Sequence, residues 1–251
     1  MNPPLLSIEN ITKHYGAVQA LRGVSFDVHA GQVLALLGDN GAGDDLDQRR
    51  LAGAQPPSGG RLVMEGKEVA FAGPADAKAA GIETVYQDLS LCPNVDVVAN
   101  FFMGRELVRR FAGLSWLRER PMEEETGTAL RNLGSSVPSL RARVDTLSGG
   151  QRQAIELARF VHWGGRLVLL DEPFAALGVT QTRRGLELIE QVKQRGVAVI
   201  VITHNVLHAL EVADRMVVLH QGRVADVRGR NETSHEDLVA LITTGGGALA
   251  A

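Results

Sequence analysis

Residues 33–43 read Val-Leu-Ala-Leu-Leu-Gly-Asp-Asn-Gly-Ala-Gly, an unbroken apolar run that passes directly into a glycine-rich turn. Apolar runs without polar alternation are typical of strands that are buried on both faces of a parallel sheet. A buried strand, a glycine turn and a following helix form the βα unit of an α/β domain. We therefore expect a parallel sheet at the centre of the fold.

The same alternation of strands and helices returns in the C-terminal half of the chain. Residues 167–170, 197–203 and 216–219 are short apolar runs, whereas residues 181–193 and 206–213 between them predict helices. In the first of these helices the apolar side chains fall on one face at helical spacing. These segments predict further strands of the same sheet and the helices that connect them.

A second layer of strands is expected near the N-terminus. Residues 5–8, 18–28 and 61–69 are rich in strand-forming residues, and the last stretch contains Gly66-Lys67 as its turn. Short strands joined by tight turns predict an antiparallel β layer.

The middle of the chain has a different character. Residues from about 88 to 161 carry several charged stretches and few β-branched runs, which favours a mainly helical insert. We expect one α/β domain over residues 1–251, with its core in residues 1–87 and 162–251 and a helical subdomain in residues 88–161.

Composition excludes several classes of protein. The 251 residues include 26 Lys plus Arg and 29 Asp plus Glu, a formal net charge of −3 that disfavours a broad basic face for nucleic acid. The single cysteine, Cys92, excludes an internal disulfide framework. The longest apolar run, Val197–Ile202, is far shorter than the roughly 20 residues of a membrane span. We expect a soluble, cytoplasmic protein that a partner must hold if it works at a membrane.

The strongest chemical signal is Leu147-Ser-Gly-Gly-Gln151, which is followed by a helical pattern. The backbone N–H groups of consecutive glycines and the positive end of the helix behind them suit a phosphate. Ser-Gly-Gly alone also occurs in ordinary turns, so the prediction depends on the whole pentamer and its helix. The expected phosphate-binding residues are Ser148, Gly149, Gly150 and Gln151.

Two buried strands end in polar residues that suit nucleotide chemistry. Asp171 and Glu172 follow one strand, where Asp171 can hold Mg²⁺ and Glu172 can polarise an attacking water as a general base. A solvated acidic pair at a strand end is the alternative interpretation. His204 follows another strand and can bind a phosphate oxygen or orient the water, although a lone histidine there is more often structural.

Two further residues are weak signals when taken singly. Gln87, which follows the strand at residues 83–86, offers an amide to Mg²⁺ or to the water. Tyr15 can stack an adenine ring.

Taken in their order along the chain, the motifs resemble those of the ATP-binding cassette (ABC) family, the nucleotide-hydrolysing subunits of membrane transporters. The resemblance covers essentially the whole chain. The resemblance implies a RecA-like P-loop NTPase core with an N-terminal β layer and a helical subdomain. It also implies ATP and Mg²⁺ as cofactors. Local matches favour the sugar-importer branch of the ribose, xylose or fructose kind; they are Gly38–Gly43, Gly81–Asp88, Met103–Glu106 and Ala175–Val179.

The resemblance also implies partners. They are membrane permease subunits, a second cassette in a homo- or heterodimer and, indirectly, a periplasmic sugar-binding protein, with no nucleic acid. The chain would then lie on the cytoplasmic face of the membrane. The segment after Gln87 is expected to contact the permease, so the apolar Val95–Phe102 stretch should be partly exposed in the isolated chain.

The phosphate loop departs from the family pattern Gly-x-x-x-x-Gly-Lys-Ser/Thr. Asp44 stands where the lysine should reach the phosphates, and Asp45 stands where a hydroxyl should bind Mg²⁺, although its carboxylate can still be a ligand. Phe174 is a milder departure, because the family usually has threonine there. The resemblance assigns nucleotide contacts in this loop to Gly38, Asp39, Asn40, Gly41, Ala42, Gly43, Asp44 and Asp45.

These changes are energetically severe. Losing a hydrogen bond from a charged donor costs about 1.5–3 kcal/mol. A carboxylate about 4 Å from a phosphate charge adds about 4 kcal/mol of repulsion at an effective dielectric constant of about 20. Even half of that sum lowers affinity or rate by more than about a hundredfold.

Three functions remain open from the sequence. One is the energising subunit of a sugar importer with an impaired ATP site. Another is a non-hydrolysing cassette that lends Leu147–Gln151 to an intact partner. The third is a free-standing cassette ATPase in DNA repair or translation, against which the near-neutral charge and the Met103–Glu106 match argue. A pair of compensating frameshifts would also give an anomaly confined to residues 44–50.

We predict that the chain binds Mg·ATP weakly and that the double change Asp44→Lys, Asp45→Ser raises the affinity more than about a hundredfold, because it removes the repulsion and restores the missing donor. Equilibrium binding of a fluorescent ATP analogue measures the change. Tight binding by the unaltered chain would contradict the prediction.

Overall fold

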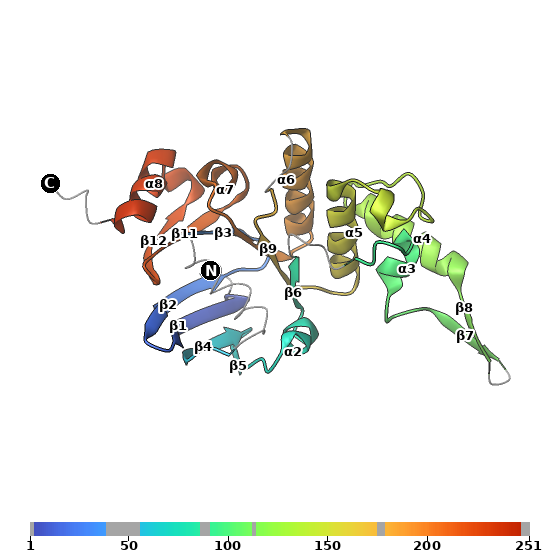
Figure 1. The fold of residues 1–251 in the computed structure, drawn as a ribbon, viewed down its shortest axis with the longest axis horizontal. Coiled ribbons are helices and arrows are strands. Elements are labelled where there is room, and N and C mark those ends of the chain that lie inside the picture. Colours follow the sequence, from blue (N-terminus) through green and yellow to red (C-terminus); the bar gives the residue numbers. More distant parts are fainter. Residues whose placement is uncertain (1–2, 39–55, 86–90, 112–113, 175–178, 247–251) are drawn as a thin grey trace. The chain divides into compact units, whose positions relative to one another are not determined.

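A computed structural model describes residues 3–38, 56–85, 91–111, 114–174 and 179–246 (Figure 1). The chain divides into two compact units. The first consists of Met1–Gln87, Gly165–Leu177 and Val192–Ala251, and the second of Asp88–Gly164 and Gly178–Gln191. Residues 178–191 therefore cluster with the second unit, whereas the sequence analysis placed them in the core.

The first unit contains a six-stranded, mostly parallel sheet. Neighbouring strands run parallel except at one edge, where β12 pairs antiparallel with β11. The apolar residues of the central strands are buried on both faces, as unbroken apolar runs predict. The α/β fold class is thus confirmed. In spatial order the strands are β12 (Arg223–Gly229), β11 (Arg215–His220), β3 (Val33–Gly38), β10 (Ala198–Ile202), β9 (Leu167–Asp171) and β6 (Ile82–Val85).

The expected antiparallel layer is a four-stranded sheet in the same unit. Its last turn is formed by Glu65 and Gly66, with φ of 49° and 76°, and not by Gly66-Lys67 as the sequence indicated. Lys67 already pairs with Met64 across the hairpin. Two successive residues with positive φ are typical of tight hairpin turns. In spatial order the strands are β2 (Val18–Val28), β1 (Leu6–Tyr15), β4 (Gly59–Met64) and β5 (Lys67–Val69).

Three of the described helices lie wholly in the first unit. They pack on strands of the six-stranded sheet, α2 on β6, α7 on β3, and α8 on β11 and β12. No helix in the described part of the chain is long and apolar enough to cross a bilayer. Their bounds are α2 (Pro74–Ala79), α7 (Val206–Val212) and α8 (His235–Thr244), and the 3₁₀ turn η3 (Arg230–Glu232) precedes α8.

The second unit is mainly helical, as expected, but it also contains a β-hairpin that the sequence analysis did not predict. Val, Phe, Leu and Trp in two four-residue runs suit strands, although runs so short show no clear alternation. The elements are α3 (Val97–Phe102), β7 (Val108–Phe111), β8 (Leu114–Leu117), α4 (Glu119–Asn132), η2 (Val144–Thr146), α5 (Gly149–His162) and all but the end of α6 (Val179–Gln194).

Helix α3 forms the core of this unit. Phe101 and Phe102 are completely buried, and the ring of Trp163 lies 5.5 Å from that of Phe102 in an edge-to-face arrangement. The expected partial exposure of Val95–Phe102 is therefore wrong for most of its large apolar side chains. The reason is that α3 packs against both α4 and α5.

The turn before α3 is closed by one buried amide. Asn100 has no exposed surface, and its Nδ2 donates to the carbonyl oxygens of Cys92, Val95 and Asp96 at 3.0, 3.1 and 3.0 Å. Its Oδ1 accepts a hydrogen bond from the backbone N–H of Cys92 at 2.7 Å. This residue therefore satisfies backbone groups that the turn would otherwise leave buried and unpaired.

Arg141 gathers carboxylates from two helices of the second unit. Its guanidinium pairs with Glu123, with Glu119 at 2.8 Å and with Asp96, the N-cap of α3, at 3.4 Å. The pKa of Arg141 is raised above its usual value, mainly by its hydrogen bond to Glu123. The cluster is largely exposed, so its contribution to stability is modest.

We predict that Phe101→Ala lowers the free energy of unfolding by about 3–5 kcal/mol, because it leaves a cavity at a completely buried position beside Phe102. Trp116→Ala is the matched control, since Trp116 is an exposed aromatic residue of the same unit and its loss should change stability by less than about 0.5 kcal/mol. Urea unfolding followed by circular dichroism measures both. Equal effects would refute the assignment of the core to α3.

Candidate functional site

The carboxyl ends of three parallel strands bring the predicted catalytic residues to one edge of the sheet. β10 lies between β3 and β9, and Ile202 is paired with Leu36 on one side and with Asp171 on the other. Gly38 ends β3 and Asp171 ends β9. Ligands of open α/β sheets bind at this edge, outside the carboxyl ends of the strands.

Glu172 is bound to His204 at this edge. Oε1 of Glu172 lies 2.6 Å from Nδ1 of His204 and accepts a hydrogen bond from the His204 backbone N–H at 2.8 Å. The Glu172 side chain is 25% exposed and that of His204 is 72% exposed. The carboxylate therefore orients an imidazole ring whose other nitrogen, Nε2, has no partner among the described residues.

Thr203 completes this arrangement, and the sequence analysis gave it no role. Its side chain is nearly fully buried, and Oγ1 donates to Oε2 of Glu172 at 3.1 Å. The same Oγ1 accepts from the backbone N–H of Asn205 at 3.1 Å. The sequence did offer a signal for this role, because Thr203 follows a buried strand and directly precedes His204. Each oxygen of the Glu172 carboxylate thus has a donor.

The backbone at Glu172 is also unusual. Its φ is 42°, in the left-handed region that residues other than glycine rarely adopt. The backbone N–H of Glu172 donates to the carbonyl of Ile202 at 2.9 Å, so the residue remains attached to β10 after β9 has ended. Such backbone conformations persist only where surrounding contacts hold them, and they are frequent at functional sites.

Phe174 contacts the helix that follows His204. Its side chain is buried, and its ring lies 5.0 Å from that of His208 on α7 at an angle of 71°. An edge-to-face pair of this kind adds to the burial of both rings. Phe174, which stands where the family usually has threonine, therefore packs the segment after Glu172 against α7.

Tyr15 ends β1, where it is half-buried and pairs with Val18 across a tight turn. The ammonium group of Lys13 lies 5.2 Å from the centre of its ring. At this distance the positive charge of Lys13 is attracted to the face of the Tyr15 ring.

Part of the predicted site lies outside the described residues. Among the described residues, no three His, Cys, Asp or Glu side chains form a cluster suited to a metal ion. Mg²⁺ commonly takes only one or two carboxylates together with phosphate oxygens, so Asp171 alone is compatible with it. The predicted residues outside the described part are Asp39, Asn40, Gly41, Ala42, Gly43, Asp44, Asp45 and Gln87.

The glycine motif of the second unit begins α5 with a complete capping box. The backbone N–H of Gln151 donates to Oγ of Ser148 at 3.3 Å, and the backbone N–H of Ser148 donates to Oε1 of Gln151 at 3.0 Å. The Gln151 side chain is thus turned back onto its own helix. Gly149 and Gly150 supply the N–H groups of the first turn, which have no partner within the helix.

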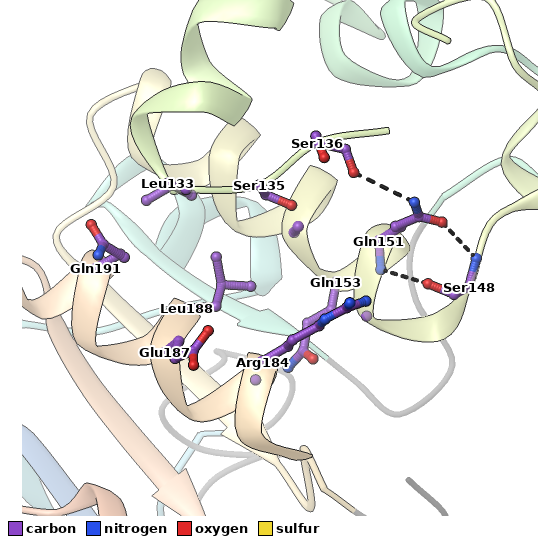
Figure 2. A pocket seen from close by; sticks show the side chains of 14 residues that line it. Leu133, Ser135, Ser136, Ser148, Gln151, Gln153, Arg184, Glu187, Leu188 and Gln191 are labelled. Carbon is purple, nitrogen blue, oxygen red and sulfur yellow. Dashed lines mark hydrogen bonds between the residues drawn. The ribbon is translucent and has the colours of Figure 1, made fainter. Parts of the chain in front are cut away.

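A pocket of about 480 Å³ opens beside this helix start (Figure 2). A side chain at Gly150 would meet nothing within 4 Å, so the helix start faces open space. Arg184 and Glu187 of α6 and the nearly buried Gln153 of α5 add polar groups to the pocket wall. The remaining lining residues are Leu133, Gly134, Ser135, Ser136, Ser148, Gln151, Ala154, Gly185, Leu188 and Gln191.

The chain belongs to the ABC transporter family, because the family model matches residues 21–175. It is 42% identical over 240 residues to a xylose/arabinose import ATP-binding protein of Sulfolobus acidocaldarius, a match that covers 96% of this chain and 94% of the relative. It is 40% identical over 244 residues to a fructose import ATP-binding protein of Rhizobium meliloti, with 96% and 94% covered.

The fold agrees with this assignment. The crystal structure of an ATP-binding cassette of an ABC transporter in its ADP conformation superposes with a TM-score of 0.79 at 23% identity. The superposition covers 97% of this chain and 96% of that cassette. The RecA-like P-loop NTPase fold expected from the motifs is therefore confirmed.

We predict that Ser148→Ala lowers the free energy of unfolding by about 1 kcal/mol, because the N–H of Gln151 loses its acceptor. Ser234→Ala is the matched control, since Ser234 caps α8 through the same kind of box with Asp237. Hydrogen exchange should accelerate at Gln151 in the first variant and at Asp237 in the second. Unchanged exchange at Gln151 in Ser148→Ala would show that the box is not formed in solution.

Proposed function

We propose that this chain is the ATP-binding subunit of a sugar importer, which couples ATP binding and hydrolysis to transport through a membrane permease. The observation that carries the proposal is its end-to-end similarity to ATP-binding proteins of xylose/arabinose and fructose import. The Met103–Glu106 segment, which resembles the sugar-importer branch, supports the same conclusion.

The proposed assembly contains permease subunits, a second cassette and, indirectly, a periplasmic sugar-binding protein. In a head-to-tail pair of cassettes, Ser148, Gly149 and Gly150 of one chain would face the nucleotide of the other. The chain would then lie on the cytoplasmic face of the membrane.

The residues at the sheet edge have distinct roles in this proposal. Glu172 is the general base for the attacking water, and it also holds Nδ1 of His204. The exposed Nε2 of His204 is then available to orient the water or a phosphate oxygen. Thr203 is a positioning residue, because it reaches the site only through Glu172.

Asp171 and Asp45 would hold Mg²⁺, with the Gln87 amide as a further ligand. When bound, the ion neutralises charge on the β- and γ-phosphates. Asp171 ends a strand at the ligand-binding edge, which supports this assignment. Tyr15 would contact the adenine, and Gly38–Gly43 would surround the phosphates.

Asp44 and Asp45 favour a second candidate, a cassette that binds nucleotide poorly and hydrolyses little itself. Such a chain would lend its Ser148–Gln151 motif to an intact partner cassette. In a homodimer both nucleotide sites carry Asp44, whereas in a heterodimer one site combines the partner's sound phosphate loop with this chain's motif.

We predict near-background phosphate release by the chain alone and about half of the full activity with an intact partner cassette. Assembly with the permease, followed by steady-state phosphate release and sugar uptake into proteoliposomes, measures both. A Glu172→Gln variant is the control. Robust hydrolysis by the chain alone that Glu172→Gln abolishes would exclude the second candidate, and the absence of sugar-stimulated activity with any permease would contradict the importer proposal.

A further inference from the structure

The β7–β8 hairpin of the second unit is a sheet of its own. Among the described residues its two strands pair only with each other, with Val108 opposite Leu117 and Arg109 opposite Trp116. In Figure 1 the hairpin extends beyond the helices of its unit. A two-stranded hairpin without packing on one face is marginally stable in water, so this element is suited to a surface that covers it.

The hairpin exposes several large apolar side chains. The exposed fractions are 44% for Val108, 59% for Leu114, 51% for Trp116 and 55% for Leu117. Every residue of β8 is exposed. Leu114 and Trp116 lie on one face of the hairpin, and Val108 and Leu117 lie on the other. Scattered exposed apolar residues need no explanation, but neighbouring ones such as Leu114 and Trp116 mark a candidate interaction site.

The hairpin is also strongly basic. Arg109, Arg110 and Arg118 lie between residues 107 and 118, a stretch without any acidic residue. None of the three side chains has an ion pair or hydrogen bond within the described part of the chain. The flanking carboxylates are engaged elsewhere, because Glu106 accepts from the backbone N–H of Gly104 at 3.0 Å and Glu119 pairs with Arg141.

We propose that the β7–β8 hairpin binds an anionic lipid surface. Trp116 and Leu114, which share one face of the hairpin with Arg109, would enter the headgroup region, while Arg109 would pair with lipid phosphates. Arg110 lies on the other face of the hairpin and would add to the attraction to the anionic surface. Tryptophan is favoured at the membrane interface because its ring is apolar and its N–H is polar. Arginine binds phosphate through a planar fork of donors, and an anionic leaflet attracts basic segments.

Charge favours lipid over other occupants of the hairpin. Cytoplasmic loops of membrane proteins carry an excess of Lys and Arg, so a permease loop would on average repel this hairpin. A second copy of the hairpin would bring the same arginines together. Paired residues of an antiparallel sheet share a face, so Arg109 and Trp116 present a cation and an aromatic ring side by side, as an interface between charged headgroups and acyl chains requires.

This inference goes beyond the proposed function, since it assigns a lipid contact to the chain itself and not only to its permease. It would add a direct lipid contact to the attachment through a partner that the sequence analysis expects. The test uses the full chain without permease, so its failure is distinct from a failure of the importer proposal.

The experiment is flotation of the chain with vesicles of phosphatidylglycerol mixed with phosphatidylcholine, compared with vesicles of phosphatidylcholine alone. We expect binding to the anionic vesicles only, weakening as salt rises because the attraction is screened. Tryptophan fluorescence should shift to shorter wavelength on binding, and Trp116→Phe should abolish this shift, since the other tryptophan, Trp163, is half-buried and its ring packs against Phe102 away from the hairpin strands. Equal binding to both kinds of vesicle, or none, overturns the proposal.

A matched pair of variants tests the arginines. Arg109→Gln with Arg110→Gln should weaken vesicle binding about thirtyfold, because each basic residue near an anionic surface contributes about fivefold. Arg131→Gln with Arg183→Gln removes the same charge from exposed arginines of α4 and α6 in the same unit and should have little effect. Equal loss of vesicle binding in both variants would indicate an effect of net charge and overturn the proposal. It would also be overturned if the chain formed dimers without vesicles and Trp116→Ala abolished them, because the hairpin would then bind a second copy of the chain.

Discussion

The position of β10 between β3 and β9 is the constraint on which the described residues of the candidate site depend. Parallel pairing on both sides fixes Ile202 beside Leu36 and beside Asp171, so the segments that follow these strands leave the sheet at the same edge. A slip of one residue in β10 would move Thr203 away from Glu172 and turn its side chain to the other face. The completely buried, unbroken apolar strands make such a slip costly.

Much of the fold could be predicted because it depends on local patterns. The apolar run before Gly38, the later runs that end at Asp171 and Thr203, and the helical spacing between them already define a parallel α/β sheet. The hairpin at β7–β8 could not be predicted in this way. Its strands are too short for alternation to be recognised, and charged residues around it favoured a helix.

Local sequence patterns also predict only part of the candidate site. Asp171, Glu172 and His204 were recognisable because each follows a buried strand. The hydrogen bond from Thr203 to Glu172 was not, since it joins residues from two strands and depends on their register. Gln151 is a comparable case, because its residue type suits a phosphate site equally well whether its amide faces the ligand or closes a capping box. Burial of Phe101 and Phe102 depends on how α3 packs between helices, which no local pattern specifies.

The division into units has a consequence for how such a chain can be altered. The chain passes between the units after residues 87, 164, 177 and 191, so the second unit is not one continuous segment. An excised piece from residue 88 to residue 191 would include β9, a strand of the first unit whose apolar side chains are buried and whose two edges pair with β10 and β6. That strand would then expose both its edges and both its faces, and an apolar strand with unpaired edges tends to aggregate. Exchange of the helical unit between related cassettes therefore requires two separate grafts, with β9 left in the recipient.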